Sequence, residues 1–155
     1  MKDNLSLVLT KPEGTGFLDT ARVELPHVGK VVLEKSVTIT EEMLRVMYPN
    51  DTDEERSVNH PHMLGKTCVV FVLEGQNIVN DLFVFVGKDR NPEMCDPRSL
   101  RYRVWNSGFF PLPVLMPSNK EYYFNGFHRV KTAEEFHLQA PIILNGSYDV
   151  LVNTQ

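Results

Sequence analysis

The chain has 155 residues, a formal net charge of −4, and 42% hydrophobic and 23% charged residues. This length suits one domain, and the acidic balance argues against a protein whose main task is to coat nucleic acid. The two cysteines, Cys68 and Cys95, lack disulfide or zinc-site spacing. With no long apolar run for a membrane span or a secretory signal, we expect a single domain over residues 1–155 in the cytoplasm.

The first half of the chain predicts alternating strands and helices. In chain order we expect a strand over 5–9, a weak short helix over 14–24, a strand over 28–39, a helix from Thr40 through Tyr48 and a central strand over 68–73. Thr40 precedes two glutamates, which is typical of an N-cap. Asp53 is a weaker candidate to cap a further short helix. Cys68 begins the apolar strand, so we interpret it as a core residue.

The second half is more irregular. We expect a helix over 78–86, a short helix over 97–101, an irregular segment over 106–120, a strand over 122–124, a helix from Thr132 through Leu138 and a terminal strand over 147–152. Phe83 to Val86 taken alone could also form a strand. The order of elements favours an α+β fold with a ferredoxin-like antiparallel sheet and helices packed on it, on one face.

Two sets of cations are candidates for an anion site. Lys11 ends the first strand beside a proline, where it either faces an anion or is simply solvated. A cationic segment over 88–103 includes Arg90 and Arg101, and arginine matches phosphate oxygens with two hydrogen bonds. Acidic residues interleave with this segment, so a solvated loop of mixed charge is the alternative.

Asn125-Gly126 predicts a hairpin turn on local evidence, because both residue types accept a positive φ. The pair His60 and His62 has a spacing that could ligate a metal on a strand. No carboxylate or cysteine supports it nearby, so we expect no metal site.

In order, these segments resemble the motifs of the nucleoside diphosphate kinase family. TKPEG at 10–14 resembles IKPDG, and CVVFVLEGQNIV at 68–79 resembles a central strand followed by an EG-x-N-x-V helix start. VGKDRNP at 86–92 resembles a G-x-T-N-P turn, and Arg101 matches the arginine of G-[ST]-I-R. YFNGFHRVKTAEEF at 123–136 aligns with I-I-H-G-S-D-S-V-x-S-A-E-x-E-I. The resemblance covers roughly residues 4–138.

The resemblance implies the fold of that family and a phosphate exchange through a phosphohistidine, with Mg²⁺ on a nucleoside di- or triphosphate. It implies nucleotide or phosphate binding by Lys11, Tyr48 and Arg101, and by Arg90 where the family has the threonine of T-N-P. It also implies a homo-oligomer, a dimer or larger.

Several family residues are missing. Asn125 aligns with the nucleophilic histidine, and an amide nitrogen has no free lone pair to attack phosphorus. The remaining departures are an arginine, an asparagine, the glutamate that orients the histidine and a base-stacking aromatic, which align with Phe83, Tyr122, Phe136 and Glu55. His128 could act as nucleophile only after a shift of three residues. We interpret Phe83 and Phe136 as signs that the site has turned apolar.

Three functions follow for testing. The favoured one is a catalytically deficient pseudoenzyme that binds nucleotide or phosphate or acts in protein interaction. The rival is an active nucleoside-diphosphate phosphotransferase that uses another nucleophile such as His128. The third is nucleic-acid binding through residues 88–103, with Tyr102 and Trp105 as stacking groups, and the net charge argues against it.

Overall fold

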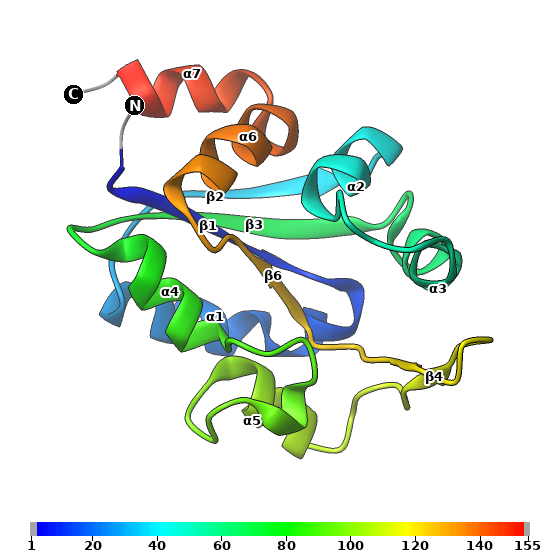
Figure 1. Cartoon of the computed structure of the whole chain (residues 1–155). Helices are drawn as coiled ribbons and strands as arrows, with labels where there is room; N and C mark the ends of the chain where they lie inside the picture. Colours follow the sequence, from blue (N-terminus) through cyan, green and yellow to red (C-terminus); the bar gives the residue numbers. More distant parts are fainter. Residues whose placement is uncertain (1–2, 154–155) are drawn as a thin grey trace.

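A four-stranded antiparallel sheet lies at the centre of the computed structural model, which describes residues 3–153 (Figure 1). Its strands are β1 (Leu5–Thr10), β2 (Lys30–Thr38), β3 (Thr67–Glu74) and β6 (Phe127–Arg129), in the spatial order β2-β3-β1-β6. The predicted ferredoxin-like α+β fold is confirmed. The expectation of helices on one face is wrong, because apolar helices cover both.

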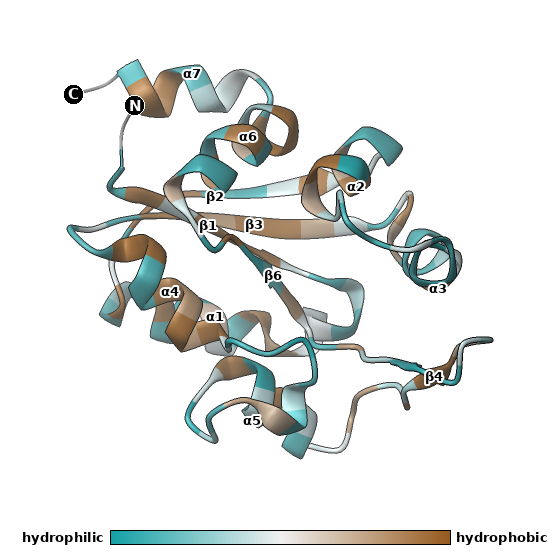
Figure 2. Cartoon of the chain, in the orientation of Figure 1, coloured by the Kyte–Doolittle hydropathy of each residue, from teal (hydrophilic) through white to brown (hydrophobic). Residues whose placement is uncertain are grey.

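Two hydrophobic cores lie against the two faces of the sheet (Figure 2). One core receives α2 (Glu41–Met47), α3 (Asp53–Met63), α6 (Ala133–Leu144) and α7 (Gly146–Asn153). The other receives α1 (Leu18–Glu24), α4 (Ile78–Val86) and α5 (Leu100–Asn106). In β1, Leu7 and Leu9 enter the first core and Val8 the second. Burial on both faces explains why β1 and β3 read as almost continuous apolar runs.

Local sequence signals predict most of the first half correctly. Thr40 caps α2, as predicted, and α4 has the predicted bounds. Helix α3 is longer than expected, and Thr52 rather than Asp53 caps it. Helix α5 begins at Leu100 with Ser99 as its N-cap, so the expected start at Pro97 is wrong. In the described part of the chain, three 3₁₀ helices complete the connections: η1 (Pro12–Phe17), η2 (Leu25–His27) and η3 (Pro92–Met94).

The C-terminal part departs from prediction. Helix α6 continues past Leu138 and through Pro141 to Leu144. The expected terminal strand over 147–152 is instead the helix α7. Its half-buried residues Tyr148, Leu151 and Val152 pack on the first core at helical spacing, which satisfies that core better than an added strand.

The predicted hairpin at Asn125-Gly126 is also wrong. Strand β5 (Glu121–Tyr122) pairs with β4 (Val114–Leu115), whereas β6 pairs with β1. Gly126 alone of the two has a positive φ, at +83°. The rest of the segment over 106–120 that follows α5 is irregular, as expected. Within residues 3–153, no helix combines the length and apolar character that crossing a membrane requires.

Candidate functional site

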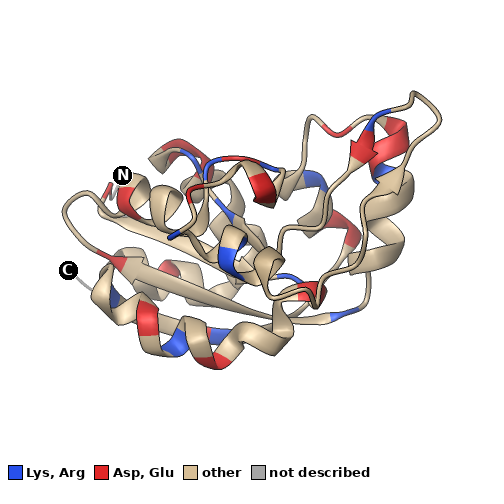
Figure 3. Cartoon of the chain, turned by 90° about the horizontal axis from the view of Figure 1, so that it is seen from below, with Lys and Arg blue, Asp and Glu red and all other residues tan. Residues whose placement is uncertain are grey.

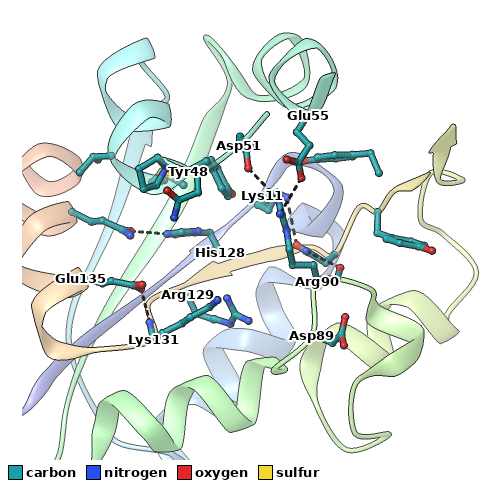
Figure 4. Close-up of a pocket in the computed structure, with 18 of the residues that line it drawn as sticks. Lys11, Tyr48, Asp51, Glu55, Asp89, Arg90, His128, Arg129, Lys131 and Glu135 are labelled. Atoms are coloured by element: carbon teal, nitrogen blue, oxygen red, sulfur yellow. Dashed lines mark hydrogen bonds and ion pairs between the residues drawn. The ribbon is translucent and has the colours of Figure 1, made fainter. Parts of the chain in front are cut away.

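A cavity of about 650 Å³ opens beside β6, between α2, α6 and the 87–92 loop that follows α4 (Figure 4). It is lined by every residue that the sequence proposes for phosphate binding or for the nucleophile position, and these are Lys11, Tyr48, Arg90, Arg101, Asn125 and His128. Most of them are nearly inaccessible, with exposed fractions of 2% for Lys11, 3% for Arg101 and 6% for Asn125. The fold therefore brings together residues that lie more than a hundred positions apart.

The backbone brings Lys11 against Asn125. The Lys11 N–H donates to the Gly126 carbonyl over 2.9 Å, at the point where β1 turns into η1. A Cβ atom at Gly14 would lie 2.2 Å from that same carbonyl oxygen, so only glycine permits this approach. The positive φ of Gly126 serves the same crossing. The two glycine motifs thus belong to one contact between distant segments.

Lys11 and Glu13 form a buried ion pair beneath Asn125. The Lys11 Nζ lies 3.6 Å from Glu13 Oε2, and it donates to Asn125 Oδ1 over 3.4 Å. Burial would raise the pKa of Glu13, but Lys11, a hydrogen bond with His62 and the Gly126 N–H outweigh it and lower that pKa to about 2. Burial, together with Arg101 and Arg90, lowers the pKa of Lys11 despite Glu13.

Two buried arginines share one carbonyl in the cavity wall. Arg101, on α5, donates to Gly87 O over 3.3 Å, and Arg129, on β6, donates to the same oxygen over 3.1 Å. Burial and the neighbouring Arg129 lower the pKa of Arg101 to about 9. In the described part of the chain, neither guanidinium has a carboxylate within ion-pair distance. Arg129 was not identified from the sequence, because no motif singles it out.

Arg90 is placed differently from the other cations, as a clasp over the cavity. It extends from the 87–92 loop to the start of α3, where it pairs with Asp51 over 3.2 Å and with Glu55 over 3.0 Å (Figure 4). Burial lowers the pKa of Arg90, but the two carboxylates outweigh it and raise that pKa. Burial raises the pKa of Asp51 despite Arg90. Arg90 therefore already has its counter-charges.

His128 is held deep in the cavity by two neighbours. Its Nε2 lies 2.7 Å from Gln139 Oε1 on α6, and its ring meets the Tyr48 ring edge-on at 5.1 Å. Burial lowers the pKa of His128 to about 3, so the imidazole is neutral at physiological pH. An amide oxygen accepts a hydrogen bond and cannot donate one, so Nε2 carries the hydrogen and Nδ1 keeps its lone pair. Sequence reasoning did not identify Gln139, which carries no motif signal.

The expectation that the site has turned apolar is wrong. Phe136 is fully buried in the first core and does not line the cavity. Phe83 also lies outside the cavity lining, and the Arg129 guanidinium lies over its ring, 4.5 Å from the centroid. Tyr122 lines the cavity and donates to Asn59 over 2.8 Å. Glu55 bonds Arg90 rather than offering a stacking surface.

The structure gives the other two candidate sites little support. In the cationic segment over 88–103, Arg98 pairs with Asp96 and Arg103 with Glu24. Over the molecule as a whole, basic and acidic positions are intermixed (Figure 3). His60 and His62 lie on the helix α3 rather than on a strand. On a helix, residues two positions apart do not share a face. Among residues 3–153, no group of three His, Cys, Asp or Glu could hold a metal ion.

Comparisons with known proteins find similarity in structure but not in sequence. No family model matches the chain, and no curated protein matches it. A nucleoside-diphosphate kinase from Borrelia burgdorferi, solved as a transition-state mimic with bound vanadate and ADP, matches with a TM-score of 0.69 and 17% identity. The match covers 89% of this chain and 84% of that one.

Two further kinases show the same likeness. The nucleoside diphosphate kinase of Aquifex aeolicus matches with a TM-score of 0.67 and 16% identity, over 94% of this chain and 98% of that one. An NDP kinase from Pyrobaculum aerophilum matches with a TM-score of 0.64 and 17% identity, over 89% and 93%. These matches extend over most of each chain, so the chain has the fold of the nucleoside diphosphate kinases.

Proposed function

We propose that this protein binds the phosphate groups of a nucleoside di- or triphosphate in the cavity and does not transfer them. One observation carries the proposal. Three buried cations, Lys11, Arg101 and Arg129, line the cavity, and within residues 3–153 the pair of Lys11 with Glu13 is the one ion pair that any of them makes. Burying a charge without a partner is costly, so this surplus of positive charge is best explained by an anionic ligand.

The proposed roles follow from position. Lys11 and Arg101 would contact phosphate oxygens, and Tyr48 would border the ligand with its hydroxyl protonated, because burial raises the pKa of Tyr48. Arg90 would join them once its carboxylate partners release it. Mg²⁺ would enter on the phosphates of the nucleotide, since its ligands there are phosphate oxygens.

Asn125 supports binding without transfer. Its Oδ1 accepts from Lys11 and its Nδ2 donates to the Arg90 carbonyl over 3.1 Å, so both ends of the amide are already engaged. A carboxamide nitrogen has no lone pair available for attack on phosphorus, so no covalent phosphoryl intermediate forms at this position. The amide can still donate or accept a hydrogen bond at the edge of the ligand.

A second candidate function, phosphoryl transfer through His128, is favoured by one observation. The hydrogen bond with Gln139 leaves the lone pair on Nδ1, and no hydrogen bond of the described residues engages that atom. Against it stands the orienting group, because a neutral amide stabilises the imidazolium that forms less than a carboxylate does. We therefore favour binding without transfer over phosphoryl transfer through His128.

Labelling and melting together test the proposal. With γ-labelled ATP and Mg²⁺, we expect no acid-labile phosphohistidine on an alkaline gel, in the wild type or in Asn125→His. The partners of the side chain at 125 are the Lys11 ammonium and the Arg90 carbonyl, so a new imidazole there would have no carboxylate to orient it. ADP with Mg²⁺ at a hundred times its Kd should add about 2.7 kcal/mol of stability in thermal melting. No shift at millimolar nucleotide would contradict binding. A labelled band that disappears in His128→Ala would establish the second candidate instead.

The resemblance to nucleoside diphosphate kinases also supports interaction with other chains. We propose a homo-oligomer of a cytoplasmic protein, and a role in assembly alongside ligand binding. The segment over 106–120 gives this physical support, because Phe109, Leu112 and Leu115 expose 84%, 85% and 66% of their surface. Apolar side chains gathered on one segment are typical of contact surfaces.

A further inference from the structure

Arg129 is a buried cation of the cavity that makes no ion pair within residues 3–153. Its exposed fraction is 7%, and it lines the cavity beside His128 and Asn125. The other arginine of comparable setting, Arg103, lies over Phe85 of the same helix α4 but pairs with Glu24 over 2.7 Å. Arg129 has no such carboxylate in the described part of the chain.

Three contacts fix the guanidinium of Arg129 in place. Its Nε donates to Gly87 O and its Nη2 to Lys88 O, each over 3.1 Å, while its plane lies over the Phe83 ring. These bonds use two of its five N–H groups. A guanidinium oriented by backbone carbonyls and an aromatic ring loses little freedom when it binds a further anion, which favours it as a ligand-binding group.

Phe83 occupies a position that bears on the role of Arg129. The resemblance expects a cation at 83, on α4, and the chain has an apolar ring there instead. The Arg129 guanidinium lies 4.5 Å from the centroid of that ring. A guanidinium therefore lies next to position 83, where the resemblance expects a cation, but it comes from β6 rather than from α4.

We propose that Arg129 is a phosphate-binding residue of the cavity, acting with Arg101 and Lys11 in place of the cation absent at Phe83. This inference rests on the proposed function. Arg129 and Arg101 both reach Gly87 O, so their remaining N–H groups converge on one region, which suits a phosphate with oxygens on several sides. The like charges repel each other without a ligand, and a bound dianion would relieve that repulsion.

Calorimetric titration with two probes, ADP with Mg²⁺ and inorganic pyrophosphate, tests the inference. Arg129→Gln should weaken both by about tenfold or more, because a charge-assisted hydrogen bond to phosphate is lost. Arg103→Gln is the matched control, since it removes an arginine stacked on α4 outside the cavity, and its affinities should stay as in the wild type. Equal loss for both probes identifies phosphate, rather than the nucleoside, as the group contacted.

A charge relocation separates a binding role from a structural one. In the Phe83→Arg/Arg129→Gln double variant, a guanidinium returns from α4 to the same region, and affinity should recover at least in part, to within about threefold of the wild type. If Arg129→Gln does not fold, Arg129→Lys replaces it, and loss of the planar fork should still weaken binding about threefold. Unchanged affinity in the folded variant overturns the inference alone. Failure of the wild type to bind either probe overturns the proposed function with it.

Discussion

Glu13 keeps its charge inside the protein because three groups stabilise it. Its carboxylate has no exposed surface, and it contacts the Lys11 ammonium, the His62 ring and the Gly126 N–H. These contacts lower its pKa from 4.5 to about 2, against the effect of burial. A depressed carboxylate pKa adds stability that is fully present above the unfolded pKa and is lost as the pH falls toward the folded one.

We therefore expect Glu13→Gln to cost about 3 kcal/mol of unfolding free energy at pH 7, and much less at pH 2. Wild-type stability should fall between pH 4.5 and pH 2 more steeply than that of the variant. Urea unfolding at several pH values measures both. Asp19→Asn is the control, because that side chain is 99% exposed and its loss should change little. Parallel pH profiles for the wild type and Glu13→Gln would contradict the ion-pair account.

How far the sequence predicts the site differs from residue to residue. Lys11, Arg101 and Asn125 could be found because each lies in one of the motifs that the chain shares with nucleoside diphosphate kinases. Arg129 and Gln139 could not, because their roles depend on the packing of β6 against α4 and α6. Charge surplus in a cavity is a property of three-dimensional packing, and no spacing along the chain encodes it.

At the scale of elements, the contact between the β1–η1 turn and the start of β6 holds the site together. The carbonyl of Gly126 accepts from Lys11 N, and Gly14 packs directly against it. This contact sets where Lys11 and Asn125 meet, so the positions of both side chains in the cavity depend on one backbone crossing.

Gly14→Ala should separate these two segments. Its Cβ would lie 2.2 Å from the Gly126 oxygen, and overpacking against backbone costs about 1–3 kcal/mol. Gly16→Ala is a matched control on the same 3₁₀ helix, since nothing lies within 4 Å of a Cβ there. Chemical denaturation should therefore separate the two variants, and nucleotide-induced stabilisation should weaken in Gly14→Ala only. Equal stability of the two alanine variants would show that the crossing can relax without cost.

Element prediction failed where pairing partners decide the structure. Asn-Gly carries a strong local hairpin signal, yet β6 pairs with β1, more than a hundred residues away in sequence. Three residues of strand give little periodicity of their own. The strand predicted over 147–152 is instead the helix α7, because the first core takes Tyr148, Leu151 and Val152 at helical spacing.

At the scale of the molecule, the two-faced sheet leaves the cavity open at its β6 edge. Helices α2 and α6 border it from the first-core side, and the 87–92 loop approaches from the second-core side. Among residues 3–153, two ion pairs join that loop to the region around the start of α3, and both come from Arg90. The antiparallel sheet was predictable from the order of elements, whereas the helices on both of its faces and this closure were not.

The Arg90 clasp makes ligand entry a question of rate. Because Arg90 must leave Asp51 and Glu55 before it can meet a phosphate, ADP should associate more slowly than diffusion permits. Glu55→Gln should accelerate association several-fold in stopped-flow mixing. Glu54→Gln makes the same charge change at a carboxylate that bonds Ser118 instead, and should accelerate it far less. Equal rates for both variants would mean that charge alone, not release of the clasp, governs entry. The same arginine should also slow the dissociation of a bound ligand, because the ligand leaves only after Arg90 has released its phosphate.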